Sequence, residues 1–205
     1  MENTLYIVDD HEMLREGVKH WLETNTGWKV TKNYSSASAC IKELAQINED
    51  SPDFPEIIIV DVQIADESGF TLVREILKKW PKMKCIIYSM YDTTGYVLEA
   101  KDCGAKAYIS KIAKSEEILK CLELVKNGDT YLEERLTEAQ NKLENVISIL
   151  TKQERRIFEA ILQGKTNEQI QNELFLSKTT VETYTSRLYD KIDVIDRADL
   201  IARYK

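Results

Sequence analysis

Glycine and proline are scarce in this sequence, with only seven glycines and three prolines among 205 residues. Since glycine and proline mark tight turns and flexible linkers, their scarcity argues against an all-β architecture and against long flexible connections. Hydrophobic residues make up 43% and charged residues 31% of the chain. This balance is typical of a globular protein and excludes a disordered or fibrous one.

Long hydrophobic runs are missing as well. The apolar run Ile57–Val60 stops at Asp61, far short of the ~20 residues that a membrane-spanning helix needs. The first residues, Met1-Glu2-Asn3-Thr4, lead directly into the strand-like Leu5–Val8, so we expect no signal peptide. We therefore expect a cytoplasmic protein with no membrane partner.

Sulfur and nitrogen ligands for a metal are few. The sequence has two histidines, and its four cysteines are widely spaced with no CxxC pair: Cys40, Cys85, Cys103 and Cys121. This spacing disfavours both a zinc site and a disulfide framework. The apolar residues around each cysteine predict that all four pack in the core.

The net charge of -7 is unevenly distributed. Residues 1–128 hold 16 basic and 21 acidic side chains, residues 129–150 hold 2 and 5, and residues 151–205 hold 10 and 9. Only the C-terminal segment has a positive balance, so it is the part that we expect to approach a polyanion.

Up to residue 128, short apolar runs alternate with segments of helical periodicity. The runs predict five strands, which are Leu5–Val8, Lys29–Thr31, Glu56–Val60, Cys85–Tyr88 and Ala107–Ile109. Apolar runs of this length, bounded by polar residues, are typical of strands buried on both faces of a parallel sheet. The alternation predicts a doubly wound α/β domain with a five-stranded parallel sheet.

Beyond residue 128 the strand pattern disappears. Residues 129–147 are charged and helix-permissive, and we interpret them as a linker that is partly helical. Residues 148–205 predict four short helices, two of which open on capping boxes formed by Thr151 with Glu154 and by Thr166 with Gln169. The short turn Leu174–Ser177 between the second and third helices is typical of a helix-turn-helix.

Polar side chains stand where four of the predicted strands end. The first strand ends in Asp9-Asp10, the third in Asp61, the fourth in Ser89 and the fifth in Ser110-Lys111. Ligands of an open parallel sheet bind at the carboxyl ends of its strands. If these four strands are neighbours, three carboxylates, a hydroxyl and an ammonium group converge; otherwise each acidic residue is a solvated strand end.

Such a cluster has a definite chemistry. Three crowded carboxylates repel one another unless a cation neutralises them, which implies a hard divalent ion such as Mg²⁺. A carboxylate beside Mg²⁺ can attack a phosphoryl group and form an aspartyl phosphate. Lys111 and Ser89 would then donate hydrogen bonds to the phosphoryl oxygens.

These residues carry a resemblance to a known family. Residues 1–128 resemble the receiver domain of two-component response regulators, which has a flavodoxin-like fold. The matching segments are Asp9-Asp10, Ile58–Val62, Ser68–Phe70, Ser89 and Gly104–Lys111.

The resemblance implies that Asp61 accepts a phosphoryl group from a histidine kinase, with Ser89 and Lys111 as phosphoryl ligands. It implies that Asp10, Asp61 and the backbone carbonyl of Gln63 ligate Mg²⁺, while Asp9 acts through water. Tyr108 takes the place of the family's rotating switch aromatic, the alternative being an ordinary strand aromatic.

Two departures qualify the resemblance, and one neighbouring histidine needs an interpretation. Ile64-Ala65 replaces a frequent Met-Pro, and Ile112 replaces a frequent proline, so we expect altered loop geometry but no lost chemical group. His11 follows the acidic pair, and we interpret it as an exposed residue at a helix start rather than as a phosphocarrier.

The C-terminal segment resembles the LuxR-type DNA-binding domain of the NarL/FixJ family. The matching segments are Leu150–Arg155, Gly164–Ile170, Leu176–Tyr184 and Lys191-Ile192. A helical projection of Lys178–Lys191 places Val181, Tyr184, Leu188 and Ile192 on the buried side. The residues expected to contact DNA bases or phosphates are Thr166, Lys178, Thr179, Glu182, Thr183, Ser186 and Arg187.

Charge is the unusual feature of this helix. Glu182 stands where the family commonly has lysine, and Tyr184 where it has histidine. A glutamate can accept a hydrogen bond from cytosine N4, but it also repels phosphate. We expect salt-dependent DNA binding that requires a dimer, the alternative being a C-terminal domain that binds a protein partner.

The sequence thus predicts a phosphorylation-controlled transcriptional regulator that forms a homodimer when phosphorylated and then binds double-stranded DNA. It would catalyse only the phosphoryl transfer onto its own Asp61, so we do not expect a metabolic enzyme. An aspartate-nucleophile phosphohydrolase of the haloacid-dehalogenase type needs a second carboxylate two residues after the nucleophile, where this chain has Gln63. Walker-type and GxGxxG loops are missing, which leaves nucleotide binding without support.

Overall fold

The computed structural model describes residues 3–204, so the predicted domain ends at residues 1–2 and 205 lie outside it. A six-stranded parallel sheet has the strand order β2-β1-β3-β6-β7-β8. Its strands are β1 (Asn3–Val8), β2 (Trp28–Tyr34), β3 (Ile57–Val60), β6 (Lys84–Ser89), β7 (Ala107–Ser110) and β8 (Tyr131–Leu132). The predicted doubly wound sheet is confirmed, and the four strands that end in polar residues are adjacent, as the site hypothesis requires.

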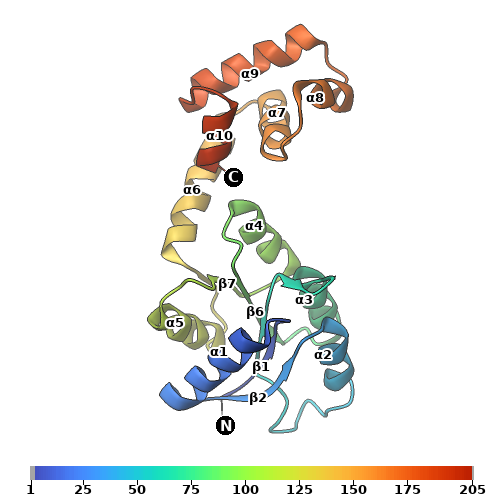
Figure 1. The fold of residues 1–205 in the computed structure, drawn as a ribbon, viewed down its shortest axis with the longest axis vertical. Coiled ribbons are helices and arrows are strands. Elements are labelled where there is room, and N and C mark those ends of the chain that lie inside the picture. The colour runs from blue at the N-terminus through green and yellow to red at the C-terminus, as the bar shows by residue number, and fades with distance from the viewer. Residues whose placement is uncertain (1–2, 205) are drawn as a thin grey trace. The chain divides into compact units, whose positions relative to one another are not determined.

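Helices cover both faces of this sheet (Figure 1). They are α1 (Glu12–Asn25), α2 (Ala37–Leu44), α3 (Gly69–Lys79), α4 (Thr94–Cys103) and α5 (Ser115–Lys126). Alternate residues of β1, Leu5 and Ile7, join Leu22 of α1 and Leu122 of α5 in one buried cluster. Helices α2, α3 and α4 lie on the opposite face (Figure 1), so strands buried on both sides read as continuous apolar runs.

The sheet differs from the prediction at one edge. β8 pairs parallel with β7, so the sheet has six strands rather than five. Two residues are too few to show a periodicity, and Tyr131-Leu132 therefore gave no recognisable strand pattern. The predicted core position of the cysteines is confirmed, because all four are buried and free.

A small hairpin follows β3, formed by β4 (Gln63–Ile64) and β5 (Glu67–Ser68). Ala65 lies in its turn with a φ of 52°, a left-handed conformation that is uncommon for a residue with a side chain. Of the departing pair Ile64-Ala65, Ile64 lies in β4 and Ala65 forms the two-residue hairpin turn together with Asp66.

The chain divides into two compact units. The first contains the residues up to Asp92 together with Tyr96–Glu133, and the second contains Thr93–Gly95 and the residues from Glu134 onward. The helices of the second unit are α6 (Glu134–Ile149), α7 (Lys152–Leu162), α8 (Asn167–Leu174), α9 (Lys178–Ile192) and α10 (Arg197–Tyr204). Residues 129–147, interpreted as a linker, contain β8 and most of α6.

Side-chain caps explain where α7 and α8 begin. The Thr151 hydroxyl accepts from the Glu154 amide at 3.4 Å, and the Glu154 carboxylate accepts from the Thr151 amide at 2.8 Å. Thr166 and Gln169 repeat this pattern at 3.2 and 2.8 Å. Both predicted capping boxes are confirmed, and Gly164 follows the end of α7 with a φ of 79°.

Helix α9 packs against α7 and α8, and α10 packs against α7. The inner side of α9 buries Val181, Leu188 and Ile192 as predicted, while Tyr184 is half-buried rather than fully enclosed. Within residues 3–204, none of the helices has both the length and the apolar character that crossing a membrane requires.

Candidate functional site

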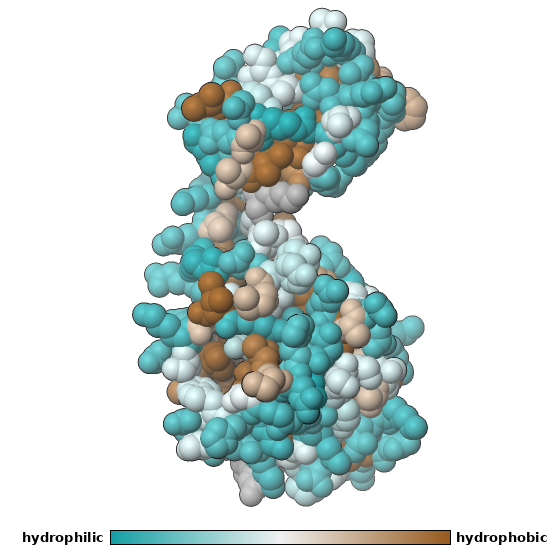
Figure 2. Space-filling view, viewed as in Figure 1, coloured by the Kyte–Doolittle hydropathy of each residue, from teal (hydrophilic) through white to brown (hydrophobic). Residues whose placement is uncertain are grey.

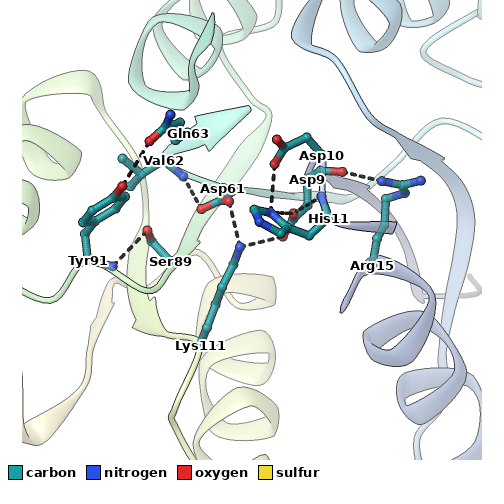
Figure 3. A network of polar contacts seen from close by, with 10 residues as sticks. All are labelled: Asp9, Asp10, His11, Arg15, Asp61, Val62, Gln63, Ser89, Tyr91 and Lys111. Atoms are coloured by element: carbon teal, nitrogen blue, oxygen red, sulfur yellow. Dashed lines mark hydrogen bonds and ion pairs between the residues drawn. The ribbon is translucent and has the colours of Figure 1, made fainter. Parts of the chain in front are cut away.

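The carboxyl ends of β1, β3, β6 and β7 surround a cavity of about 460 Å³. Its lining residues are Asp10, His11, Asp61, Gln63, Ser89, Met90, Tyr91 and Lys111. Figure 3 shows all of these side chains except Met90, and they gather around Asp61 from the ends of four strands. The structure therefore brings together the acidic pair, the third carboxylate, the hydroxyl and the lysine that the sequence placed at strand ends.

Asp61 lies directly after β3 and is only 5% exposed. One oxygen, Oδ1, accepts a hydrogen bond from the Val62 amide at 2.7 Å, and the other, Oδ2, accepts from Lys111 Nζ at 2.7 Å. Burial raises the pKa of the Asp61 carboxyl, and Lys111 opposes this without cancelling it. The carboxylate is thus fixed in orientation and poorly solvated, with one charged partner.

Lys111 joins two strand ends through a single ammonium group (Figure 3). Its Nζ lies 2.7 Å from Asp61 Oδ2 and 2.7 Å from Asp9 Oδ2, and its side chain is 4% exposed. Its backbone N–H donates to the Ser89 carbonyl at 2.8 Å, which fixes the loop after β7 against the end of β6. One buried cation is thereby shared between two buried carboxylates.

The cluster has the donor set of a divalent cation site. Ligand atoms of Asp9, Asp10, His11 and Asp61 all lie within 4.8 Å of one another. Asp10 Oδ1 is buried and accepts no hydrogen bond from the residues described, and His11 Nδ1 lies 2.9 Å from it. A carboxylate-rich set with an unsatisfied buried oxygen fits a hard cation such as Mg²⁺.

His11 lies next to this cluster, at the start of α1. It occupies the N-cap position of α1, with a side chain that is 70% exposed. Its backbone N–H donates to Asp9 Oδ1 at 2.8 Å. This placement agrees with the interpretation of His11 as an exposed residue at a helix start.

Ser89 and Tyr108 are connected through Tyr91. Ser89 is fully buried, and its hydroxyl accepts from the Tyr91 amide at 3.3 Å. Tyr108 is 2% exposed, and its hydroxyl donates to the Tyr91 carbonyl, so the ring is turned inward in this structure. Burial raises the pKa of the Tyr108 hydroxyl, which therefore stays a donor.

Tyr91 also reaches the other side of the cavity. Its hydroxyl donates to Gln63 Oε1 at 3.0 Å, and its ring stacks on Tyr96 with a centroid separation of 4.8 Å. The sequence prediction did not single out Tyr91, because a tyrosine two residues after a strand end has no distinguishing pattern. Gln63 was selected for its backbone carbonyl, and its exposed side chain contacts Tyr91.

Two further supports of the site were not predicted. The Arg15 guanidinium is buried, donates to the Asp9 carbonyl and donates to Asn33 Oδ1 at 3.1 Å. Gly69, at the start of α3, lies so close to β3 that a Cβ there would stand 1.8 Å from the Asp61 carbonyl oxygen. A Ser-Gly pair at a helix start was the available signal for this close approach.

The residues predicted to contact DNA are all exposed in the second unit. Thr166 is the N-cap residue of α8, and the others lie on α9: Lys178, Thr179, Glu182, Thr183, Ser186 and Arg187. On the helix surface, Lys178 Nζ lies 4.0 Å from Glu182 Oε1, and the Thr183 hydroxyl donates to the Thr179 carbonyl at 2.8 Å. These residues share the solvent side of α9, opposite its buried Val181 and Leu188.

Comparison with known proteins agrees with this arrangement. Residues 5–123 match the family described as response regulator receiver domain, and residues 148–204 match the family described as bacterial regulatory proteins, luxR family. The chain therefore belongs to the response regulators with a LuxR-type DNA-binding domain. It is a transcriptional regulator in which a receiver precedes a helix-turn-helix domain.

Individual relatives cover almost the whole chain. The DNA-binding transcriptional activator DevR/DosR of Mycobacterium tuberculosis is 30% identical over 195 residues, which span 92% of this chain and 87% of that protein. The transcriptional regulatory protein LiaR of Bacillus subtilis is 28% identical over 198 residues, with coverages of 93% and 91%.

A solved structure of RcsB from Salmonella enterica serovar Typhimurium, bound to promoter P1flhDC in the presence of phosphomimetic BeF3-, has the same fold. It aligns with a TM-score of 0.70 and 18% identity, covering 99% of this chain and 98% of that one.

Proposed function

We propose that Asp61 accepts a phosphoryl group from a phosphohistidine of a partner histidine kinase. One oxygen of Asp61 attacks phosphorus, the phosphorus–nitrogen bond breaks, and the imidazole nitrogen keeps the electron pair. The observation that carries this proposal is the buried Lys111 ammonium, which lies 2.7 Å from both Asp61 and Asp9. A fixed cation at the acceptor stabilises the negative charge that the incoming phosphoryl oxygens bring.

The neighbouring groups have separate roles in this proposal. Lys111 and the Ser89 hydroxyl donate to phosphoryl oxygens. Asp10, Asp61 and the Gln63 backbone carbonyl would hold Mg²⁺, with Asp9 contacting it through water, and the ion when bound neutralises charge on the carboxylates and the phosphoryl group. The buried Asp10 Oδ1, which accepts no hydrogen bond from the described residues, supports this assignment.

Phosphorylation adds close to two negative charges at Asp61. The Ser89 hydroxyl turns toward the phosphoryl group and leaves the Tyr91 amide, which it holds at 3.3 Å in this structure. Because Tyr91 also accepts from Tyr108, the loop after β6 and the switch aromatic respond together. The altered surface favours a homodimer whose two α9 helices enter the major groove at half-sites about one helical turn apart.

The contacts proposed for DNA follow from the exposed side of α9. Lys178, Thr179 and Thr166 contact phosphates, whereas Glu182 and Thr183 face base edges. Ser186 and Arg187 continue the same side of the helix toward its carboxyl end. A cytoplasmic location, where both kinase and DNA are accessible, completes the proposal.

Intact-mass measurement of the phosphorylated protein tests the acceptor. With Mg²⁺ and a small-molecule phosphodonor, the wild-type chain should gain one phosphoryl group, and Asp61→Asn should gain none. Asp66→Asn, a matched change at an exposed aspartate of the hairpin turn, should behave as wild type. Equal incorporation into Asp61→Asn would refute the assignment, as would incorporation that is independent of Mg²⁺.

A second candidate function is favoured by Glu182, since an acidic residue on α9 opposes approach to phosphates. In that case the C-terminal domain binds a protein partner. Phosphoryl incorporation at Asp61 without specific binding to any genomic DNA fragment at low salt would support this alternative.

A further inference from the structure

Helix α9 presents an unusual set of groups on its solvent side. The five outward residues of the predicted reading surface are Thr179, Glu182, Thr183, Ser186 and Arg187. Glu182 is the one acid and Arg187 the one base among these five. Figure 2 shows mostly hydrophilic to neutral atoms along the rim of the second unit that α9 forms in Figure 1, with a hydrophobic patch near the carboxyl end of the helix. The predicted reading surface itself consists of polar and charged side chains.

Glu182 is available for an external contact. Its side chain is 53% exposed, and its ion pair with Lys178 spans 4.0 Å, the outer limit of such a contact. An exposed ion pair of this spacing within one helix contributes little to stability. The carboxylate can therefore leave Lys178 at little cost when a better donor approaches.

The neighbouring side chains do not compete for the same role. The Thr183 hydroxyl already donates to the Thr179 carbonyl at 2.8 Å, and the Thr180 hydroxyl contacts the Ser177 hydroxyl at 2.7 Å. Glu182 is thus the outward group in the first half of α9 that only accepts hydrogen bonds and that carries a full charge.

We infer that Glu182 makes this protein select a cytosine in each DNA half-site, by accepting a hydrogen bond from the cytosine N4 amino group. This inference rests on the proposed DNA binding by α9. In the major groove guanine presents N7 and O6 acceptors and thymine presents an O4 acceptor, all of which repel a carboxylate. Adenine offers its N6 amino group beside the N7 acceptor, whereas cytosine offers N4 with no acceptor of its own.

The negative charge of Glu182 increases the discrimination between bases. A carboxylate that enters a groove lined by phosphates is repelled everywhere, so binding tolerates Glu182 only where a base donor compensates. A good base contact discriminates by ~1–3 kcal/mol, which corresponds to roughly 5- to 150-fold in affinity. Glu182 therefore acts as a specificity-determining residue at one base pair and as a cost at every other base.

Selection from a randomised DNA pool by the phosphodonor-treated full chain tests the inference. The sequenced motif of the wild-type protein should contain a cytosine position. In Glu182→Gln this position should change to adenine, because a glutamine amide pairs with adenine N6 and N7. Glu159→Gln removes the same charge from an exposed ion pair on α7 and should leave the motif unchanged.

Duplexes with single substitutions give a second readout. Replacing the selected cytosine by thymine should weaken wild-type binding about tenfold or more, and should weaken Glu182→Gln far less. Identical motifs for the wild type and Glu182→Gln would overturn the inference. Tighter binding of Glu182→Gln to all sequences alike would also overturn it, since Glu182 would then act through charge alone.

The two proposals fail in different ways. If the folded wild-type chain selects no motif at low salt, the DNA-binding proposal fails and this inference fails with it. If a motif is selected but does not depend on residue 182, DNA binding stands and only the cytosine assignment is refuted.

Discussion

Replacing Glu154 by glutamine should destabilise the second unit, because Glu154 ties the start of α7 to the end of α9. Its Oε2 lies 2.7 Å from Lys191 Nζ and accepts from the Thr151 amide and hydroxyl, each at 2.8 Å. Burial raises the pKa of the Glu154 carboxyl, but Lys191 and Thr151 outweigh it and lower the pKa from 4.5 to about 2. The folded state thus binds the carboxylate more favourably than the acid.

The size of the effect follows from this difference in pKa. A decrease from 4.5 to about 2 corresponds to roughly 3 kcal/mol of stabilisation at neutral pH. The Lys191 side chain is 39% exposed, and solvent screening reduces the contribution, so we expect Glu154→Gln to cost about 2 kcal/mol. A folded-state pKa below the unfolded one stabilises above pH 4.5, and this stabilisation is lost as the pH falls from 4.5 toward 2.

Two measurements report separately on the stability of the two units, which are urea unfolding followed by tryptophan fluorescence and hydrogen exchange. All three tryptophans, Trp21, Trp28 and Trp80, belong to the first unit, so their fluorescence reports on the receiver. Hydrogen exchange of amides in α7 and α9 reports on the second unit. At pH 7 we expect Glu154→Gln to lower the free energy of opening of the second unit, measured by hydrogen exchange, by about 2 kcal/mol. The urea midpoint of the tryptophan fluorescence should stay unchanged.

The matched control is Glu159→Gln, which removes a carboxylate from an exposed pair with Arg155 on the same helix. Its effect should stay within ~0.5 kcal/mol. Equal destabilisation by the two variants, or a difference between wild type and Glu154→Gln that does not shrink between pH 4.5 and pH 2, would refute the reasoning.

Three further predictions concern the acceptor site and the DNA surface. Gly69→Ala places a Cβ 1.8 Å from the Asp61 carbonyl oxygen. We therefore expect the free energy of unfolding measured by tryptophan fluorescence to fall by ~1–3 kcal/mol and phosphorylation to become slower. If neither quantity changes, the close approach is contradicted. Asp10→Asn removes one of three clustered carboxylates and should stabilise the metal-free receiver. Mg²⁺ should raise the urea midpoint of the wild type but not that of the variant. An equal increase in both proteins would mean that the ion binds elsewhere. Lys178→Gln removes a phosphate contact and should lower the slope of log affinity against log salt by about 1 with an unchanged motif; an altered base preference would instead make Lys178 a base-reading residue.

Much of the receiver sheet and its acceptor cluster is predictable from the sequence, because buried parallel strands produce apolar runs whose ends are visible. Ile57–Val60 followed by Asp61 is such a run. That the four strand ends are neighbours was only a condition of the site hypothesis, and the strand order of the structure meets it. The capping boxes at Thr151 and Thr166 are local, so they could be predicted without knowledge of the fold.

Contacts between distant segments could not be predicted in this way. The hydroxyl of Tyr91 reaches Gln63, 28 residues away, and Arg15 reaches the Asp9 carbonyl and Asn33 only after β1, α1 and β2 have packed. β8 depends on the edge of β7 for its hydrogen bonds rather than on any pattern of its own. Such features depend on packing, which a single sequence does not display.

The most direct test of the account is the affinity of the full chain for a selected DNA site, measured by gel shift with Mg²⁺ and with or without a small-molecule phosphodonor. We predict that the phosphodonor tightens binding by the wild-type and Asp66→Asn proteins and has no effect on Asp61→Asn. DNA affinity that responds equally in Asp61→Asn, or that does not respond in the wild type despite phosphoryl incorporation, would contradict the claim that Asp61 controls DNA binding.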